Sequence, residues 1–160
     1  MTTLVVQMHP VPESFNAAVL EATLAGLGRA GIEPDVRRLG QGDALEADDL
    51  DGVETLVVVA PTWWGGPPAQ LLERLQALLG AAPSPLRSVR RLMVVTTHGS
   101  SQLVNTLQGE PGRRLWKRVV LPLCAPGATF DWVALYKIDR LDEDGRVTFL
   151  DRVTSAAAQL

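Results

Sequence analysis

The sequence predicts an α/β fold in which one doubly wound, five-stranded parallel sheet carries helices on both faces. Strand-length apolar runs alternate with helix-length segments along the chain, which is the pattern of such a sheet. Residues 55–60 form an almost continuous apolar run, as expected for a central parallel strand that is covered on both faces. The chain has 160 residues, 46% of them hydrophobic, so we expect residues 1–160 to form a single domain.

The other expected strands are short runs rich in β-branched and aliphatic residues, at 4–6, 35–39, 92–95 and 129–136. The expected helices have apolar residues at helical spacing and cover about 14–31, 67–80, 111–120 and 148–158. Pro111 opens the third of these, which should turn Leu115, Val119 and Val120 inward. Thr148 and Asp151 have the spacing of a capping box and predict the start of the last helix. The acidic connection that ends at Gly52 is expected to be a flexible surface segment.

Composition excludes several classes of function. With 15 Lys and Arg against 18 Asp and Glu, the net charge of −3 argues against nucleic acid or an anionic membrane as the main partner. Cys124 is the single cysteine, so no internal disulfide or Cys-rich zinc site can form, and a buried structural thiol is expected. No apolar run approaches the roughly 18 residues of a membrane span. We therefore expect a cytoplasmic protein with a small-molecule partner, no membrane insertion and no metal.

Parallel sheets of this kind bind ligands outside the carboxyl ends of their strands. Three unusual loops follow expected strands, at residues 9–16, 61–66 and 96–100, and should converge on one edge. In the first loop, Ser14 can cap a helix whose free N–H groups near Phe15 and Asn16 suit a phosphate. The alternative is that Ser14 is only a cap and His9 only a surface histidine.

The second loop contains Trp63 and Trp64, followed by Gly65 and Gly66. Adjacent tryptophans point in different directions, so at least one should be exposed, and the glycines let the backbone approach a flat ligand. A cover for a core edge or a dimer interface is the alternative.

The third loop offers hydroxyls and N–H groups that can stabilise negative charge on an electron-accepting heterocycle, to which a protonated His98 would add a positive charge. An ordinary turn is the alternative. A basic cluster further along could receive a nucleotide phosphate, although a solvated helix face is the favoured interpretation. Its members are Arg113, Arg114, Lys117 and Arg118.

Together these loops resemble those of the flavodoxin-like NAD(P)H:quinone oxidoreductases, the group of DT-diaphorase and the potassium-efflux-ancillary enzymes. Residues 9–16 resemble their phosphate loop, 61–69 their isoalloxazine loop and the helix after it, and 96–100 with 107–109 their third flavin loop. The match runs in order from residue 1 to about residue 112. The resemblance implies a flavodoxin-like three-layer fold.

It also implies a flavin-dependent oxidoreductase that transfers a hydride from NAD(P)H through the flavin to a quinone or similar acceptor. No protein nucleophile is needed for such chemistry, so no catalytic side chain is assigned. FMN is expected rather than FAD because the chain is short, although family members use either. The implied flavin-binding residues are His9, Ser14, Phe15 and Asn16 at the phosphate, Pro61, Thr62, Trp63, Trp64 and Gly65 along the ring, and Thr96, Thr97, His98 and Gly99 at its pyrimidine end.

Some positions depart from the family pattern. His98 stands where a second glycine is common, and Val104 and Pro111 stand near where the quinone-reductase branch has Tyr and His. The stretch between Leu79 and Arg90 is also short, which implies a more open pocket or one completed by a second subunit, and we expect a homodimer. The alternative functions are a flavodoxin-like electron carrier and a non-catalytic flavin-binding or ancillary protein.

Overall fold

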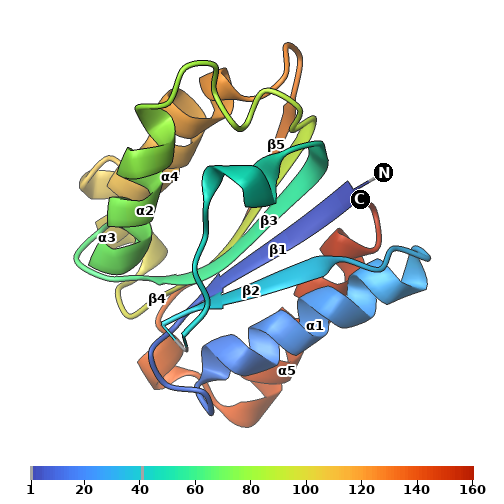
Figure 1. Cartoon of the computed structure of the whole chain (residues 1–160). Helices are drawn as coiled ribbons and strands as arrows, with labels where there is room; N and C mark the ends of the chain where they lie inside the picture. The colour runs from blue at the N-terminus through green and yellow to red at the C-terminus, as the bar shows by residue number, and fades with distance from the viewer. Residues whose placement is uncertain (1, 41) are drawn as a thin grey trace.

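A computed structural model describes residues 2–40 and 42–160 and confirms the predicted parallel sheet (Figure 1). Its strands lie in the order β2-β1-β3-β4-β5, and every neighbouring pair is parallel. The run predicted to be a central strand belongs to β3, in the middle of the sheet. All carboxyl ends therefore meet at one edge. The strands are β1 (Thr2–Met8), β2 (Asp35–Leu39), β3 (Val53–Thr62), β4 (Arg91–His98) and β5 (Thr129–Leu135).

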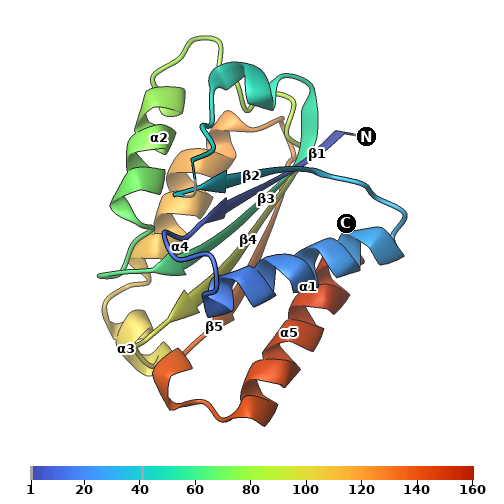
Figure 2. The same ribbon diagram turned by 60° about the horizontal axis from the view of Figure 1, so that its bottom comes forward.

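Helices cover both faces of the sheet, as predicted (Figures 1 and 2). Helices α1 (Phe15–Arg29) and α5 (Glu143–Ala157) lie against one face, and α2 (Ala69–Leu79) and α4 (Pro111–Leu115) against the other. Because side chains alternate along a strand, Val5 joins the core under α1 and α5, whereas Leu4 and Val6 join the core under α2. Within the described residues, none of the helices is long and apolar enough to cross a membrane.

The two helices of the first face are in close contact. The Thr154 hydroxyl of α5 donates a hydrogen bond of 3.1 Å to the Ala22 carbonyl of α1. A Cβ added at Gly26 of α1 would lie 2.7 Å from the Cβ of Ala157 in α5. Glycine is therefore needed at position 26 for the two backbones to approach this closely.

The predicted start of the last helix is wrong. Helix α5 begins at Glu143, and Thr148 lies inside it. Asp142 is the cap, because its Oδ1 accepts a hydrogen bond of 2.9 Å from the Gly145 N–H. The capping-box spacing of Thr148 and Asp151 arises within the helix and marks no boundary.

The predicted inward position of Val119 is also wrong, since its side chain is 45% exposed. Helix α4 continues into a wider π turn, Trp116–Val120, whose extra residue shifts which side chains face the sheet. Trp116 and Val120 take the buried positions, and Leu115 is half-buried.

The acidic connection after β2 is more ordered than a flexible surface segment. It forms a short 3-10 turn, Ala47–Leu50, and buries Leu45 and Leu50 in the core under α2. Asp49 accepts a hydrogen bond of 2.7 Å from the Arg37 guanidinium of β2. These contacts tie the connection to the sheet. Residue 41, which lies in it, is outside the described residues.

Candidate functional site

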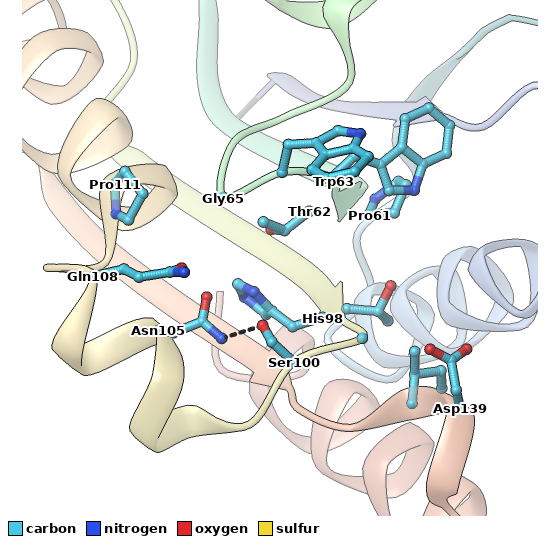
Figure 3. Close-up of a pocket in the computed structure, with 14 residues that line it drawn as sticks. Pro61, Thr62, Trp63, Gly65, His98, Ser100, Asn105, Gln108, Pro111 and Asp139 are labelled. Carbon is cyan, nitrogen blue, oxygen red and sulfur yellow. Dashed lines mark hydrogen bonds between the residues drawn. The ribbon is translucent and has the colours of Figure 1, made fainter.

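A cavity of about 680 Å³ lies at the carboxyl edge of the sheet (Figure 3). Its walls come from the loops after β3, β4 and β5 and from the segment that joins α3 (Gln102–Leu107) to α4. The lining residues are Pro61, Thr62, Trp63, Trp64, Gly65, Thr97, His98, Gly99, Ser100, Asn105, Gln108, Pro111, Ile138 and Asp139. A cavity of this size accommodates a typical small-molecule ligand.

The second and third predicted loops meet in this cavity. All five residues predicted along the flavin ring line it, and so do three of the four predicted at its pyrimidine end. Thr96 is the exception, because its hydroxyl forms a hydrogen bond of 2.8 Å with that of Thr62 on the neighbouring strand. Thr96 therefore does not line the cavity itself but holds the side chain of Thr62, which does.

The tryptophan loop forms an exposed apolar ledge at the cavity. Trp64 is fully exposed, at 105%, and has a φ of +53°, whereas Trp63 is partly exposed. Two backbone hydrogen bonds of 2.8 and 3.0 Å between Trp63 and Gly66 close the turn. Gly65 has a φ of +83°, and a Cβ there would lie 3.0 Å from the Pro111 ring. The loop is thus held against the start of α4 with its indoles free for a flat ligand.

The first predicted loop does not line the cavity but lies beside the tryptophan loop. The His9 ring meets Trp63 edge-on, with 5.9 Å between ring centroids. The half-buried ring of Phe15 lies toward Phe149 of α5, with 6.4 Å between ring centroids.

The start of α1 holds polar groups that the protein itself does not satisfy. Ser14 occupies the cap position, but its hydroxyl makes no capping hydrogen bond. The Ser14 Oγ and the Asn16 Oδ1 are both buried without a partner, and Asn16 is only 3% exposed. Unpaired buried polar atoms are costly, and the first N–H groups of a helix favour an anion. The Ser14 hydroxyl and these N–H groups can therefore donate to the phosphate group of FMN, whereas Asn16 can donate to it only through its amide nitrogen, because its Oδ1 is an acceptor.

His98 is buried at the cavity, with 5% of its surface exposed. Its ring stacks on Tyr136, with centroids 4.7 Å apart, and meets Trp132 edge-on at 6.3 Å. Burial lowers the pKa of His98, opposed by Asn105 and Glu110, which favour the charged form. Neither ring nitrogen has a hydrogen-bond partner, and the Asn105 amide donates elsewhere, so we regard burial as dominant. Because the pKa is lowered, the ring is predominantly uncharged at neutral pH, and the positive charge that a protonated His98 would add is not favoured there.

Six cavity residues lie outside the predicted flavin-binding set. Ser100 and Gln108 belong to segments that the resemblance covered and Pro111 begins a predicted helix, whereas Asn105, Ile138 and Asp139 were not singled out at all. Asn105 lies on the unpredicted helix α3, where its amide donates hydrogen bonds of 2.8 Å to the Ser100 hydroxyl and 2.9 Å to the Ser101 carbonyl. Ile138 and Asp139 follow β5. Applying the carboxyl-end rule to the fifth strand as well would have found these two residues.

The other sequence candidates lie away from this cavity. Cys124 is buried, as expected, and desolvation raises the pKa of its thiol to about 11, which keeps it protonated and unreactive. In the part of the chain that the structure describes, no three His, Cys, Asp or Glu side chains are grouped so that they could hold a metal ion. The basic cluster surrounds a separate, smaller cavity.

Comparisons with known proteins agree with this architecture. The profile of the family Flavodoxin_2, described as a flavodoxin-like fold, matches residues 1–119. Smu.1420 from Streptococcus mutans UA159 is similar in structure, with a TM-score of 0.77 over 100% of both chains at 22% sequence identity. An NAD(P)H:quinone oxidoreductase from Methanothermobacter marburgensis has a TM-score of 0.79 at 18% identity, over 99% of this chain and 96% of that one.

A third similar structure is an FMN-dependent NADH-azoreductase from Bacillus anthracis in complex with FMN. Its TM-score is 0.75 at 15% identity, over 99% of each chain. No protein of curated function matches the sequence. At these identities the structural likeness shows the fold, and the profile match over most of the chain shows the family. The five parallel strands, the loops at their carboxyl edge and the matched profile together place this chain in the Flavodoxin_2 family of flavodoxin-like proteins.

Proposed function

We propose that the protein is a flavin-dependent NAD(P)H oxidoreductase that reduces a quinone or a similar acceptor by two electrons. Bound FMN would accept a hydride from NAD(P)H and pass it to the acceptor. The observation that carries the proposal is the pairing of two features at one sheet edge: unsatisfied buried polar atoms at the start of α1 and an exposed indole ledge at a cavity of about 680 Å³. Two of the similar structures are an NAD(P)H:quinone oxidoreductase and an FMN-dependent NADH-azoreductase.

Each part of the site has a role in this proposal. Ser14 and Asn16 would hold the phosphate, together with the free N–H groups of the first turn of α1. Trp63 and Trp64 would lie along the ring and exclude water from one of its sides. The main chain at Thr97 and Gly99 would bind the pyrimidine end. Donor and acceptor would use the remaining space of the cavity in turn.

We further propose that the protein acts as a homodimer, with residues 1–160 as its flavin-binding domain. Trp64 lies at the cavity, and Leu103 and Leu107 are exposed on nearby α3, which leaves large apolar side chains in water. A second copy would cover these side chains and close the pocket. Sedimentation equilibrium measures the mass directly. The proposed use of NAD(P)H adds to the single, unpaired Cys124 as a reason to propose that the protein acts in the cytoplasm.

The experiment that tests this function begins with the absorbance of the purified protein in the flavin bands and with mass spectrometry of the released cofactor. Steady oxidation of NADH or NADPH with a quinone is expected. Bound flavin without such turnover would favour the electron carrier or the ancillary protein, and a protein that binds no flavin would refute the proposal.

The phosphate site is tested by the double variant Ser14→Ala/Asn16→Ala. Two polar contacts to a charged group are worth about 1.5–3 kcal/mol each, so the variant should bind FMN at least about a hundredfold more weakly. The control is Ser155→Ala, because the Ser155 hydroxyl only donates to the Asp151 carbonyl of its own helix, at 2.8 Å. Unchanged FMN affinity in the double variant would exclude this loop as the phosphate site.

A further inference from the structure

The basic cluster surrounds a second cavity, of about 320 Å³, which we call the basic groove. It is lined by Thr106, Gly109, Glu110, Arg113, Arg114, Lys117 and Arg118. Four cations and one carboxylate therefore face this small space, although the whole chain carries a net charge of −3. The groove thus concentrates positive charge on a weakly acidic molecule, and such a field attracts anions.

Most of this charge is not neutralised by neighbouring side chains. Arg113 forms an ion pair of 3.2 Å with Glu110. Across residues 2–40 and 42–160, no ion pair is found for Arg114, Lys117 or Arg118. A simple solvated helix face commonly alternates its charges, whereas this face leaves three cations available to an external anion.

One of these cations lies close to the backbone of the groove. Gly109 has a φ of +78°, and a Cβ there would lie 2.9 Å from the Arg114 Nη1. The guanidinium of Arg114 thus lies close over the backbone at Gly109, where the positive φ favours glycine. A guanidinium presents a planar fork of donors that matches a phosphate group.

The basic groove and the main cavity share a wall, the segment 105–111. Asn105, Gln108 and Pro111 line the main cavity, whereas Thr106, Gly109 and Glu110 line the basic groove. A ligand whose reactive end lies in the main cavity could therefore extend an anionic end into the groove. A reduced pyridine dinucleotide has this form, with its nicotinamide at one end and its adenosine at the other.

We propose that the basic groove binds the adenosine 2′-phosphate of NADPH and makes NADPH the preferred donor over NADH. This inference rests on the proposed function, since it names the donor of that reaction. Four clustered cations suit one phosphate better than they suit a nucleic acid, whose binding commonly uses about 6–10 phosphate contacts along a track. The concave shape also favours a small ligand over a macromolecule.

The test compares two probes that differ only by the 2′-phosphate, 2′,5′-ADP and 5′-AMP, by calorimetry on the full chain. The wild type should bind 2′,5′-ADP at least about tenfold more tightly, which corresponds to about 1.4 kcal/mol. The double variant Arg114→Gln/Arg118→Gln should lose this preference and raise KM for NADPH by a similar factor, with KM for NADH unchanged. Equal binding of the two probes by the wild type, or a preference that survives in the double variant, would overturn the proposal.

Two further variants sharpen the result. Arg146→Gln removes an exposed cation from α5, on the opposite face of the sheet, and should leave both affinities unchanged. Glu110→Gln removes the groove's carboxylate and frees Arg113, so it should tighten 2′,5′-ADP binding about two- to fivefold, the range for an ion pair near the surface.

The two hypotheses fail separately. Binding of 2′,5′-ADP in the groove without turnover of either donor would leave the groove standing and refute the oxidoreductase. Turnover with equal preference for NADH and NADPH would support the oxidoreductase and refute the basic groove as a site for the 2′-phosphate.

Discussion

Burial of His98 should make the protein less stable in mild acid. In the unfolded chain this histidine takes up a proton below its ordinary pKa of about 6.5. In the folded protein its ring is stacked on Tyr136 without a hydrogen-bond partner, and burial lowers its pKa. The unfolded state therefore binds more protons than the folded state as the pH falls below about 6.5, and the free energy of unfolding decreases.

Linkage limits the size of this effect. One proton changes the free energy of unfolding by at most about 1.4 kcal/mol per pH unit, and only where the unfolded histidine is protonated, so His98 alone can remove at most about 1.4 kcal/mol between pH 7.5 and pH 5.5. The variant His98→Phe keeps an aromatic ring against Tyr136 but cannot titrate. Its stability should therefore fall less than that of the wild type over the same pH interval.

Urea unfolding at pH 7.5 and pH 5.5, at equal ionic strength and matched flavin content, measures this difference. His9→Gln is the control, because it removes the other histidine of the chain and retains His98, so the acid loss should persist. An equal acid loss in the wild type and in His98→Phe would refute the reasoning, since the buried imidazole would then contribute nothing to the pH dependence.

Two predictions concern the packing of the fold. Gly26→Ala should lower the free energy of unfolding by about 1–3 kcal/mol, because the new methyl group would lie 2.7 Å from the Cβ of Ala157. Gly28→Ala is the control: no atom lies within 4 Å of the new methyl group, so the free energy of unfolding should rise by about 0.5–1 kcal/mol. Thermal or urea unfolding compares the two, and equal effects would contradict the close approach of α1 and α5. Gln7 is fully buried with both amide atoms unpaired, so Gln7→Leu should stabilise the protein by about 1 kcal/mol, while Gln76→Leu on the exposed surface of α2 should not.

The sheet was predictable because buried parallel strands leave a strong signal. The run that became β3 is almost continuously apolar, and the alternation with helices determined the fold class. Helix α3 was missed because it has only six residues, and most of its side chains are exposed. The start of α5 was misplaced because its first turn, with Glu143, Asp144 and Gly145, has the composition of a loop.

The site was predictable to the extent that topology positions it. The rule that ligands bind at carboxyl ends of strands located the loops with Trp64 and His98, and the structure brings both to one cavity. The charge state of His98 was not predictable from its loop, because Tyr136 and Trp132, which bury it, come from a distant part of the sequence. The sequence likewise could not predict that the Ser14 hydroxyl makes no capping hydrogen bond, since serine is a common N-cap residue.

The contact between α1 and α5 has a consequence for synthesis of the chain on the ribosome. Helix α1 emerges early, but the residues that pack against Gly26, among them Ala157, belong to α5, which is made last of the helices described. Until then the apolar face of α1 and the sheet side that carries Val5 and Val57 lack their final cover. Pairings between segments so distant in sequence form slowly, and exposed apolar surface invites aggregation. Nascent chains stalled before residue 143 should therefore be more sensitive to protease and recruit chaperones more strongly than the released chain of 160 residues.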